Sequence, residues 1–379
     1  MKITTILMKL TQTLRVLGWA LCLVFISSCS KDDPVATSHV LLVYLGGNNN
    51  LSGESYQKLQ ALVQGWDARP ENKLLIFHDP ADAPPQLLEV SPSDTGIPTT
   101  RLIYRYEEVN SADSEVFASV IDEVRRIYPS SGYGLLVFSH ASGWLPVGTL
   151  LKPRSVIVDG NSEMNIIDFA HAIPNGTFDY IVFEACFMAG IEVAYELKDK
   201  TKYILASSAE ILSPGFTDIY PRALGLLFEG STGLQTFANI AFSYFKGQSG
   251  YMQSATFSVI KTSELEPLAF FIKEYAVSGA IRDIMDIQHF DRYQTYRLFF
   301  DFEDYYAGLM TDELQQQELH RLVGKTVVWK ASTPDFMLGY NGFVIRQHSG
   351  LTTYIPQDRF PFLNQEYRKL AWIRVTGVK

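Results

Sequence analysis

Two residues that can carry out nucleophilic catalysis each follow a short apolar run. The stretch GLLVFSH ends at His140, and YIVFEAC ends at Cys186. A cysteine nucleophile needs a base within hydrogen-bonding reach and an acid that protonates the leaving amine, and one imidazole can serve both purposes. His140 and Cys186 therefore form a candidate catalytic dyad.

The elements that must position this dyad follow an alternation of strands and helices. Leu59, Leu62 and Val63 have helical spacing after a possible Ser52 cap, and a second apolar stripe begins at Val116. Short, continuously apolar runs are typical of buried central strands, and they occur at 39–45, 73–77, 134–138, 155–158, 180–183 and 203–206. The pattern predicts an α/β fold with a largely parallel sheet and helices on both faces. Sites in such sheets form at the carboxyl ends of strands.

The surroundings of Cys186 favour a reactive thiol. Met188, Ile191 and Tyr195 have helical spacing, which predicts that Cys186 lies at a helix N-terminus, where the dipole favours thiolate. Cys22 and Cys29 both lie in the first 29 residues, so a processed chain keeps one thiol and forms no internal disulfide.

Each dyad residue also has an ordinary interpretation. A single cysteine after a strand is often an inert core residue, and a single histidine is often a hydrogen-bonded loop residue. Their joint occurrence at two strand ends favours the dyad. No metal site is predicted, because no spacing with cysteines or carboxylates typical of metal ligands is found at His78, His171, His289, His320 and His348.

The N-terminal 29 residues have the composition of an export signal. Lys2, Lys9 and Arg15 precede the uncharged stretch 16–26, which is too short to span a bilayer. The stretch FISSC resembles a bacterial lipobox, which makes Cys29 the expected lipidation site; the alternative is an ordinary secretory peptide. The acidic SKDD that follows resembles a signal for the outer surface. We expect an exported outer-membrane lipoprotein, anchored by its N-terminal lipid through a tether at 30–38.

Composition bounds the rest of the chain. The 379 residues carry a formal net charge of −9, and no basic run is present, which excludes nucleic acid as an expected partner. The α/β alternation extends over 39–225, the expected catalytic domain. Residues 226–379 contain helix-like and late strand-like segments without a Gly/Ser linker, so a packed C-terminal α/β subdomain is expected.

At the level of whole motifs, the chain resembles the clostripain family of cysteine peptidases, in the clan of caspases, legumains and gingipains. The matching stretches are LLVYLGGNNNLS, YGLLVFSHASGW, FDYIVFEACFMAGIEVAYELKD, YILASSAEILSPGF, HSGLTTYIPQD and YRKLAWIRVTG. The order of His140 and Cys186, 46 residues apart, also matches the caspase pattern.

This resemblance implies a caspase-like fold and cleavage of peptide bonds after Arg or Lys. Cys186 would attack the carbonyl, and His140 would protonate the departing amine. The backbone N–H groups of Ala141 and Cys186 would bind the oxyanion.

Two residues depart from the family pattern. Ala141 replaces the usual glycine after the histidine, which would be strained if that position required a positive φ. Glu184 replaces the usual aspartate of the specificity pocket, so a carboxylate remains on a longer side chain. Glu210 and Asp218 are further candidates for substrate binding.

Family members cut themselves in the loop after the catalytic histidine. The bond between Arg154 and Ser155 fits the expected specificity within the 145–160 loop, whereas Lys152 is followed by proline. No cofactor is expected. Some relatives require calcium, but the sequence has no Asp-rich calcium loop, and metal dependence stays open.

Two other functions are compatible with the sequence. An inactive protein of the same fold could act as a binding protein, with Ala141 as the main argument. A surface glycan-binding lipoprotein could use the aromatic side chains of 282–306 as stacking platforms.

Overall fold

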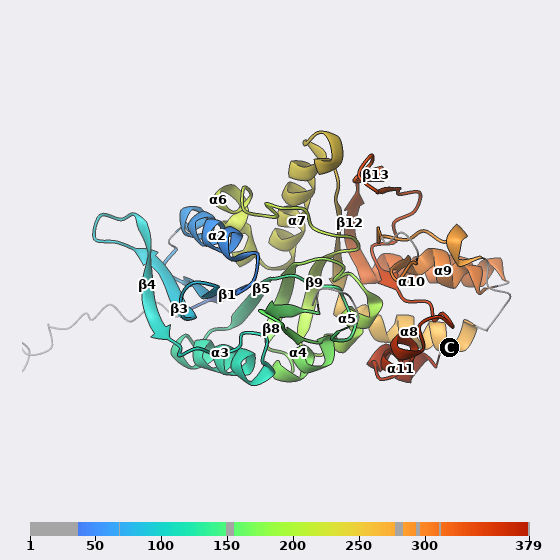
Figure 1. Ribbon diagram of the computed structural model, residues 1–379, viewed down its shortest axis with the longest axis horizontal. Helices are drawn as coiled ribbons and strands as arrows, with labels where there is room; N and C mark the ends of the chain where they lie inside the picture. The colour runs from blue at the N-terminus through green and yellow to red at the C-terminus, as the bar shows by residue number, and fades with distance from the viewer. Residues whose placement is uncertain are drawn as a thin grey trace, which may run out of the picture. The chain divides into compact units, whose positions relative to one another are not determined.

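A nine-stranded sheet forms the centre of the computed structural model, which describes residues 37–377 except 68, 149–154, 277–282, 293–295 and 311. The strand order is β12-β10-β9-β8-β5-β1-β2-β3-β4 (Figure 1). The strands of this sheet are β1 His39–Gly47, β2 Asn72–Pro80, β3 Gln86–Pro92, β4 Pro98–Arg105, β5 Gly132–Phe138, β8 Phe178–Glu184, β9 Thr201–Ser207, β10 Thr256–Lys261 and β12 Val327–Ser332.

The central five strands, β2, β1, β5, β8 and β9, pair in parallel. Their side chains are almost completely buried, as expected for strands covered on both faces. The expected α/β class with a largely parallel sheet is confirmed.

Helices pack on both faces of this sheet (Figure 1). One face is covered by α2 Ser52–Gly65, α6 Tyr220–Ala223 and α7 Gly230–Lys246; the other by α3 Ser114–Ile127, α4 Ile166–Ala172, α5 Ile191–Glu196 and α8 Leu265–Tyr275. Helix α3 shows why these segments are helical. The Asp113 side chain caps its first turn, and Phe117, Val120, Ile121 and Val124 lie on one buried stripe.

The edges of the sheet are antiparallel, and of their strands only β12, one of the expected late strands, was predicted. Strands β3 and β4 extend it beyond β2, and β10 pairs antiparallel with β9. The predicted central strand at 155–158 is wrong. Residues Ile157–Asp159 form β6, which pairs only with β7 Ser162–Met164 in a separate two-stranded sheet. The run is apolar because it packs against the core and not because it is a central strand.

Residues on both sides of position 225 share the main sheet, since β10 and β12 continue it. The remaining C-terminal elements are β11 Phe300–Asp301, α9 Phe302–Gly308, α10 Glu313–Thr326, β13 Asp335–Phe336, β14 Phe343–Val344, β15 Thr352–Thr353, α11 Pro361–Tyr367 and α12 Ala371–Thr376. The late strands expected from the apolar runs GFVIRQ and LTTYI are thus only two residues long, as β14 and β15.

The expected lipidation site Cys29, with the rest of the signal segment, lies outside the described residues. Within the described ranges, no helix is both long and apolar enough to cross a membrane.

Candidate active site

The register of β5 against β8 sets the positions of the two dyad residues. Phe138 pairs with Glu184 as the last rung of the two strands. His140 and Cys186 each lie two residues beyond that rung, on adjacent parallel strands. The sheet therefore brings them to one place on its carboxyl edge, as the sequence predicted.

Four neighbouring strand ends supply this edge. Residues after β1, β5, β8 and β9 contribute Asn50, His140, Cys186 and Glu210. The chain runs from β1 to β2 on one side and later enters β5 on the other side of β1, a reversal that favours a crevice. A pocket of about 240 Å³ lies here and is lined by Leu51, Glu54, Phe138, Ser139, His140, Glu184, Ala185, Cys186, Glu210, Ile211, Leu212, Ser213 and Gly215.

His140 has a neighbour that sequence reasoning missed. Its Nε2 lies 2.8 Å from Oδ1 of Asn50. An amide oxygen only accepts, so the imidazole donates from Nε2, and in that tautomer Nδ1 carries the lone pair that can take a proton. The asparagines that follow β1 at 48–50 were the available signal, because polar side chains after a parallel strand lie at the carboxyl edge, where such sheets form sites.

The expected helix N-terminus at Cys186 is wrong. Helix α5 begins at Ile191 with Gly190 as its N-cap, and Cys186 lies in the turn before it. Spacing could not distinguish this apolar turn from the first turn of a helix. The residue after Cys186, Phe187, has a φ of 62°, and its ring stacks on Phe299 at 4.4 Å. Such a φ costs a non-glycine residue about 1–2 kcal/mol, which packing must offset.

Ala141 sits without backbone strain. It is buried in the core, and it is not among the described residues with positive φ. The substitution of glycine by alanine therefore leaves the backbone turn after His140 undistorted. Within the described part of the chain, the Ala141 amide donates no hydrogen bond to another backbone group. Ala141 itself is not among the residues that line the pocket.

Glu184 lies beneath the pocket, and both of its carboxylate oxygens accept hydrogen bonds. Its carboxylate accepts from the Lys58 ammonium at 2.5 Å, from the Phe216 amide and from the Tyr220 hydroxyl. Burial raises the pKa of Glu184, and the Lys58 charge acts against that rise. The carboxylate thus has an internal counter-ion. Lys58, on α2, was not a sequence candidate.

The other two acidic candidates have different surroundings. Glu210 lines the pocket and forms an ion pair with Arg292, Nε to Oε2 at 2.5 Å. Asp218 is not a lining residue and accepts instead from the Tyr244 hydroxyl at 2.6 Å. The structure therefore brings Glu184 and Glu210 to the pocket but not Asp218.

The expected self-cleavage bond is described on one side only, because Arg154 lies outside the described residues. Ser155 is fully buried. Its carbonyl accepts from the Ser142 amide at 3.0 Å, and its hydroxyl donates to Glu163 at 2.8 Å. The segment after the loop is thus fastened to the turn that follows His140.

C-terminal aromatic side chains pack on the same turn. The Trp144 ring lies 5.0 Å from the ring of Tyr354 and 4.9 Å from that of Tyr367. The Tyr367 hydroxyl donates to Glu192 on α5 at 3.0 Å, and the Tyr354 amide donates to the same oxygen at 2.9 Å. Burial raises the pKa of Glu192 to about 7. These contacts join the turns after His140 and Cys186 to the end of the chain.

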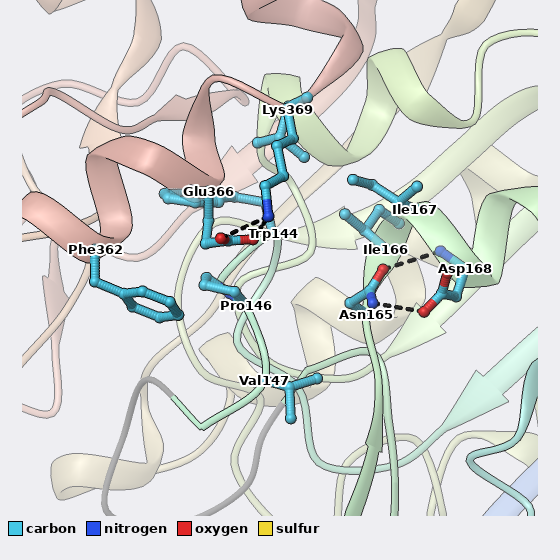
Figure 2. A pocket seen from close by; sticks show the side chains of 11 residues that line it. Trp144, Pro146, Val147, Asn165, Ile166, Ile167, Asp168, Phe362, Glu366 and Lys369 are labelled. Carbon is cyan, nitrogen blue, oxygen red and sulfur yellow. Dashed lines mark hydrogen bonds and ion pairs between the residues drawn. The ribbon is translucent and has the colours of Figure 1, made fainter.

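A second, larger pocket of about 330 Å³ lies on the far side of Trp144. Figure 2 shows Pro146, Val147 and Phe362 around it, with the Glu366–Lys369 ion pair at one side. Neither His140 nor Cys186 lines it. The smaller pocket is therefore the candidate site.

No group of three or more His, Cys, Asp or Glu side chains within the described ranges is placed to hold a metal ion. The described part of the chain contains one cysteine, Cys186.

Comparisons with known proteins agree with this geometry. The model of the Clostripain family matches residues 43–345. Clostripain from Hathewaya histolytica is 22% identical over 210 aligned positions, and the match covers 46% of this chain and 40% of that one, well under two thirds of the relative.

Two solved structures cover much more of the chain. An inactive zymogen C11 protease from Parabacteroides distasonis superposes with a TM-score of 0.78 and 29% identity, over 90% of this chain and 99% of that one. A secreted C11 cysteine protease from Bacteroides thetaiotaomicron, in complex with an irreversible peptide inhibitor, gives a TM-score of 0.78 and 25% identity over 89% and 98%.

Proposed function

Because this chain belongs to the clostripain family of cysteine peptidases, we propose that it is an endopeptidase that uses Cys186 and His140 to cleave peptide bonds after Arg or Lys. The observation that carries this proposal is the shared register of β5 and β8, which sets both residues two positions past the Phe138–Glu184 rung beside one pocket. The acidic side chains around that pocket support a basic substrate residue.

The mechanism follows from the atoms at the strand ends. The Cys186 sulfur attacks the peptide carbonyl carbon, and its proton passes to the imidazole of His140. The carbonyl oxygen becomes an oxyanion, which the amides of Ala141 and Cys186 stabilise. His140 then gives the proton to the departing amine as the C–N bond breaks. Water hydrolyses the resulting thioester with His140 as base, which restores the thiol.

Asn50 positions the imidazole during both steps. Its oxygen holds Nε2 at 2.8 Å, so the ring keeps one orientation and presents Nδ1. Such positioning fixes the distance over which the proton moves.

The activity is tested with protein lacking the first 29 residues. Fluorogenic peptides ending in Arg, Lys, Asp or Leu are compared for the wild type and Cys186→Ala. The proposal expects turnover of Arg and Lys peptides that Cys186→Ala abolishes. Cleavage only after Asp or Leu would contradict the basic specificity, and turnover retained by Cys186→Ala would contradict the dyad.

Self-processing at Arg154–Ser155 is part of the proposal. Ser155 is buried and forms hydrogen bonds with Leu145, Ser142 and Glu163. It must therefore leave these contacts before the peptide bond to Arg154 is cut. Active protein is expected to contain a fragment beginning at Ser155, and Arg154→Ala to remain a single chain. Full activity of an uncut chain would contradict the need for processing.

Export as a lipoprotein is likewise proposed from the lipobox at Cys29. Cys29→Ser is expected to move the protein from the membrane fraction to the soluble fraction of exported protein. Unchanged membrane association would contradict lipid anchoring at this residue.

The two alternative functions have less support in the described residues. The hypothesis of an inactive protein depended on backbone strain at Ala141. The backbone at Ala141 is not in the positive-φ region, so this strain is not present. The glycan-binding alternative needed exposed rings in 282–306, whereas the described ones are half-buried at Tyr296 and buried at Phe290, Phe299, Phe300, Phe302, Tyr305 and Tyr306.

A further inference from the structure

Three carboxylates line the pocket beside Cys186, and two of them already have a strong cationic partner within the chain. Glu184 pairs with Lys58 at 2.5 Å, and Glu210 pairs with Arg292 at 2.5 Å. The third, Glu54 on α2, shares Lys58 at the longer distance of 3.2 Å. Three negative groups against two positive ones leave one net negative charge. A substrate cation is attracted by that net charge and not by the number of carboxylates.

The Lys58–Glu184 pair is closed to substrate. Both side chains are at most 1% exposed. The Lys58 ammonium donates its three hydrogen bonds to Glu184, to the Pro214 carbonyl at 2.9 Å and to the Thr217 hydroxyl at 2.9 Å. It also lies 4.4 Å from the centre of the Phe138 ring. A substrate cation that reached Glu184 would meet the positive charge of Lys58 first.

Gly215 covers this pair from the pocket side. Its φ is 61°, and a Cβ there would lie 3.1 Å from Nζ of Lys58 and would collide with Glu184. Only glycine lets the backbone pass this close over the ion pair. The pair therefore forms the floor beneath the pocket.

Glu54 differs from both other carboxylates. Its side chain is 16% exposed and lines the pocket, and its second oxygen accepts from the Ser213 hydroxyl at 2.8 Å. Among the described residues, the cation that pairs with Glu54 is Lys58, which Glu54 shares with Glu184. We propose that Glu54 is the residue that recognises the basic side chain of the substrate, and that Lys58 neutralises Glu184 and removes it from that recognition. This inference rests on the proposed peptidase function.

The experiment measures kcat/KM for two peptides that differ only in the residue before the scissile bond, lysine or its uncharged analogue norleucine. The ratio of the two values reports recognition of the charge and is insensitive to general loss of activity. We expect Glu54→Gln to lower the lysine-to-norleucine ratio by at least tenfold. An unchanged ratio in Glu54→Gln overturns the proposal.

Two charge-balanced double variants serve as controls. Lys58→Met/Glu184→Gln and Glu210→Gln/Arg292→Gln each remove one internal pair without changing the net charge of the pocket. We expect the ratio to stay within threefold of the wild type in both. A ratio that collapses in Lys58→Met/Glu184→Gln but survives in Glu54→Gln would assign recognition to Glu184 instead.

The design separates this inference from the proposed function. Wild-type protein that cleaves neither peptide, or Cys186→Ala that cleaves both, contradicts the peptidase function itself. Thermal unfolding of each variant shows whether it folds. If the buried Lys58→Met/Glu184→Gln variant does not fold, Glu54→Gln alone decides the question, because Glu54 lies at the partly exposed edge of the site.

Discussion

The amide oxygen of Asn50 lies 2.8 Å from Nε2 of His140, although the two residues are 90 positions apart in the chain. They meet because β1 and β5 are neighbours in the sheet and both end at its carboxyl edge. This hydrogen bond assigns the N–H of the imidazole to Nε2 and the proton-accepting lone pair to Nδ1.

Replacing Asn50 should therefore affect catalysis more than binding. We expect Asn50→Ala to lower kcat by roughly tenfold, with KM changed much less, because the imidazole loses its orientation. Asn50→Asp should retain the orientation but favour the imidazolium, which shifts the acidic limb of the kcat pH profile upward. A purely structural role would lower both kinetic constants through partial unfolding and leave the profile in place.

Removing the Lys58 ammonium should lower the free energy of unfolding. Lys58→Met leaves the Glu184 carboxylate buried without its counter-ion, and breaking such a pair costs about 3–5 kcal/mol. Lys58→Met/Glu184→Gln should recover most of that loss, because no charge remains buried. Urea unfolding in a Cys186→Ala background, which prevents self-cleavage, measures both. If Lys58→Met alone lowers the free energy of unfolding by less than about 1 kcal/mol, the described network is contradicted.

Gly143 lies where the turn after His140 meets the turn that contains Cys186. Its φ is 62°, and a Cβ there would lie 2.7 Å from the carbonyl oxygen of Phe187, next to Cys186. Gly143→Ala should push the turns apart and lower kcat/KM by at least about tenfold. Gly176→Ala is the matched control, because Gly176 has a φ of 67° and no neighbour within 4 Å of the added atom. Equal losses of kcat/KM in both variants would mean that backbone strain alone, and not the contact with Phe187, lowers the activity.

Stability should depend on pH through Glu192. Its folded pKa is raised to about 7 from 4.5, so between these values the unfolded chain loses the proton that the folded chain keeps. The free energy of unfolding is therefore expected to fall as pH rises through that window, by on the order of 3 kcal/mol. Glu192→Gln should flatten this slope.

Glu196→Gln is the control for that measurement. Glu196 lies on the same helix and also accepts a hydrogen bond from the C-terminal part, from the Ala371 amide, but it is only partly buried. Urea unfolding at pH values from 4.5 to 7 compares the variants. A slope that persists in Glu192→Gln would assign it to other groups.

The central strands, and the position of His140 and Cys186 beside one pocket, were predictable because continuous apolar runs are typical of strands that are buried on two faces. His140 and Cys186 stood out as reactive types at the ends of such runs. The edge strands β3 and β4 were not predictable in the same way. β4 is exposed or half-buried along its length, and its apolar residues, 102–104, lie between two arginines.

The charge pattern of the pocket was beyond sequence reasoning. The predicted apolar stripe of α2 used Leu59, Leu62 and Val63, but the buried face is Ser55, Lys58, Ala61 and Leu62. The helix turns a lysine inward because Glu184, 126 residues later, supplies its counter-ion. No local pattern carries that information, since a lysine among apolar residues ordinarily points to solvent.

The packing of Tyr354 and Tyr367 on Trp144 has a consequence for biosynthesis. Tyr354 and Tyr367 follow Trp144 by more than 200 positions, so a growing chain cannot order that turn until both residues have left the ribosome. Proteolytic activity is therefore expected to begin only after these residues have been synthesised, which protects the growing polypeptide from cutting itself. Ribosome-bound chains stopped before residue 349 should react slowly with an active-site peptide inhibitor, and released chains that contain both residues rapidly; equal labelling would contradict this order.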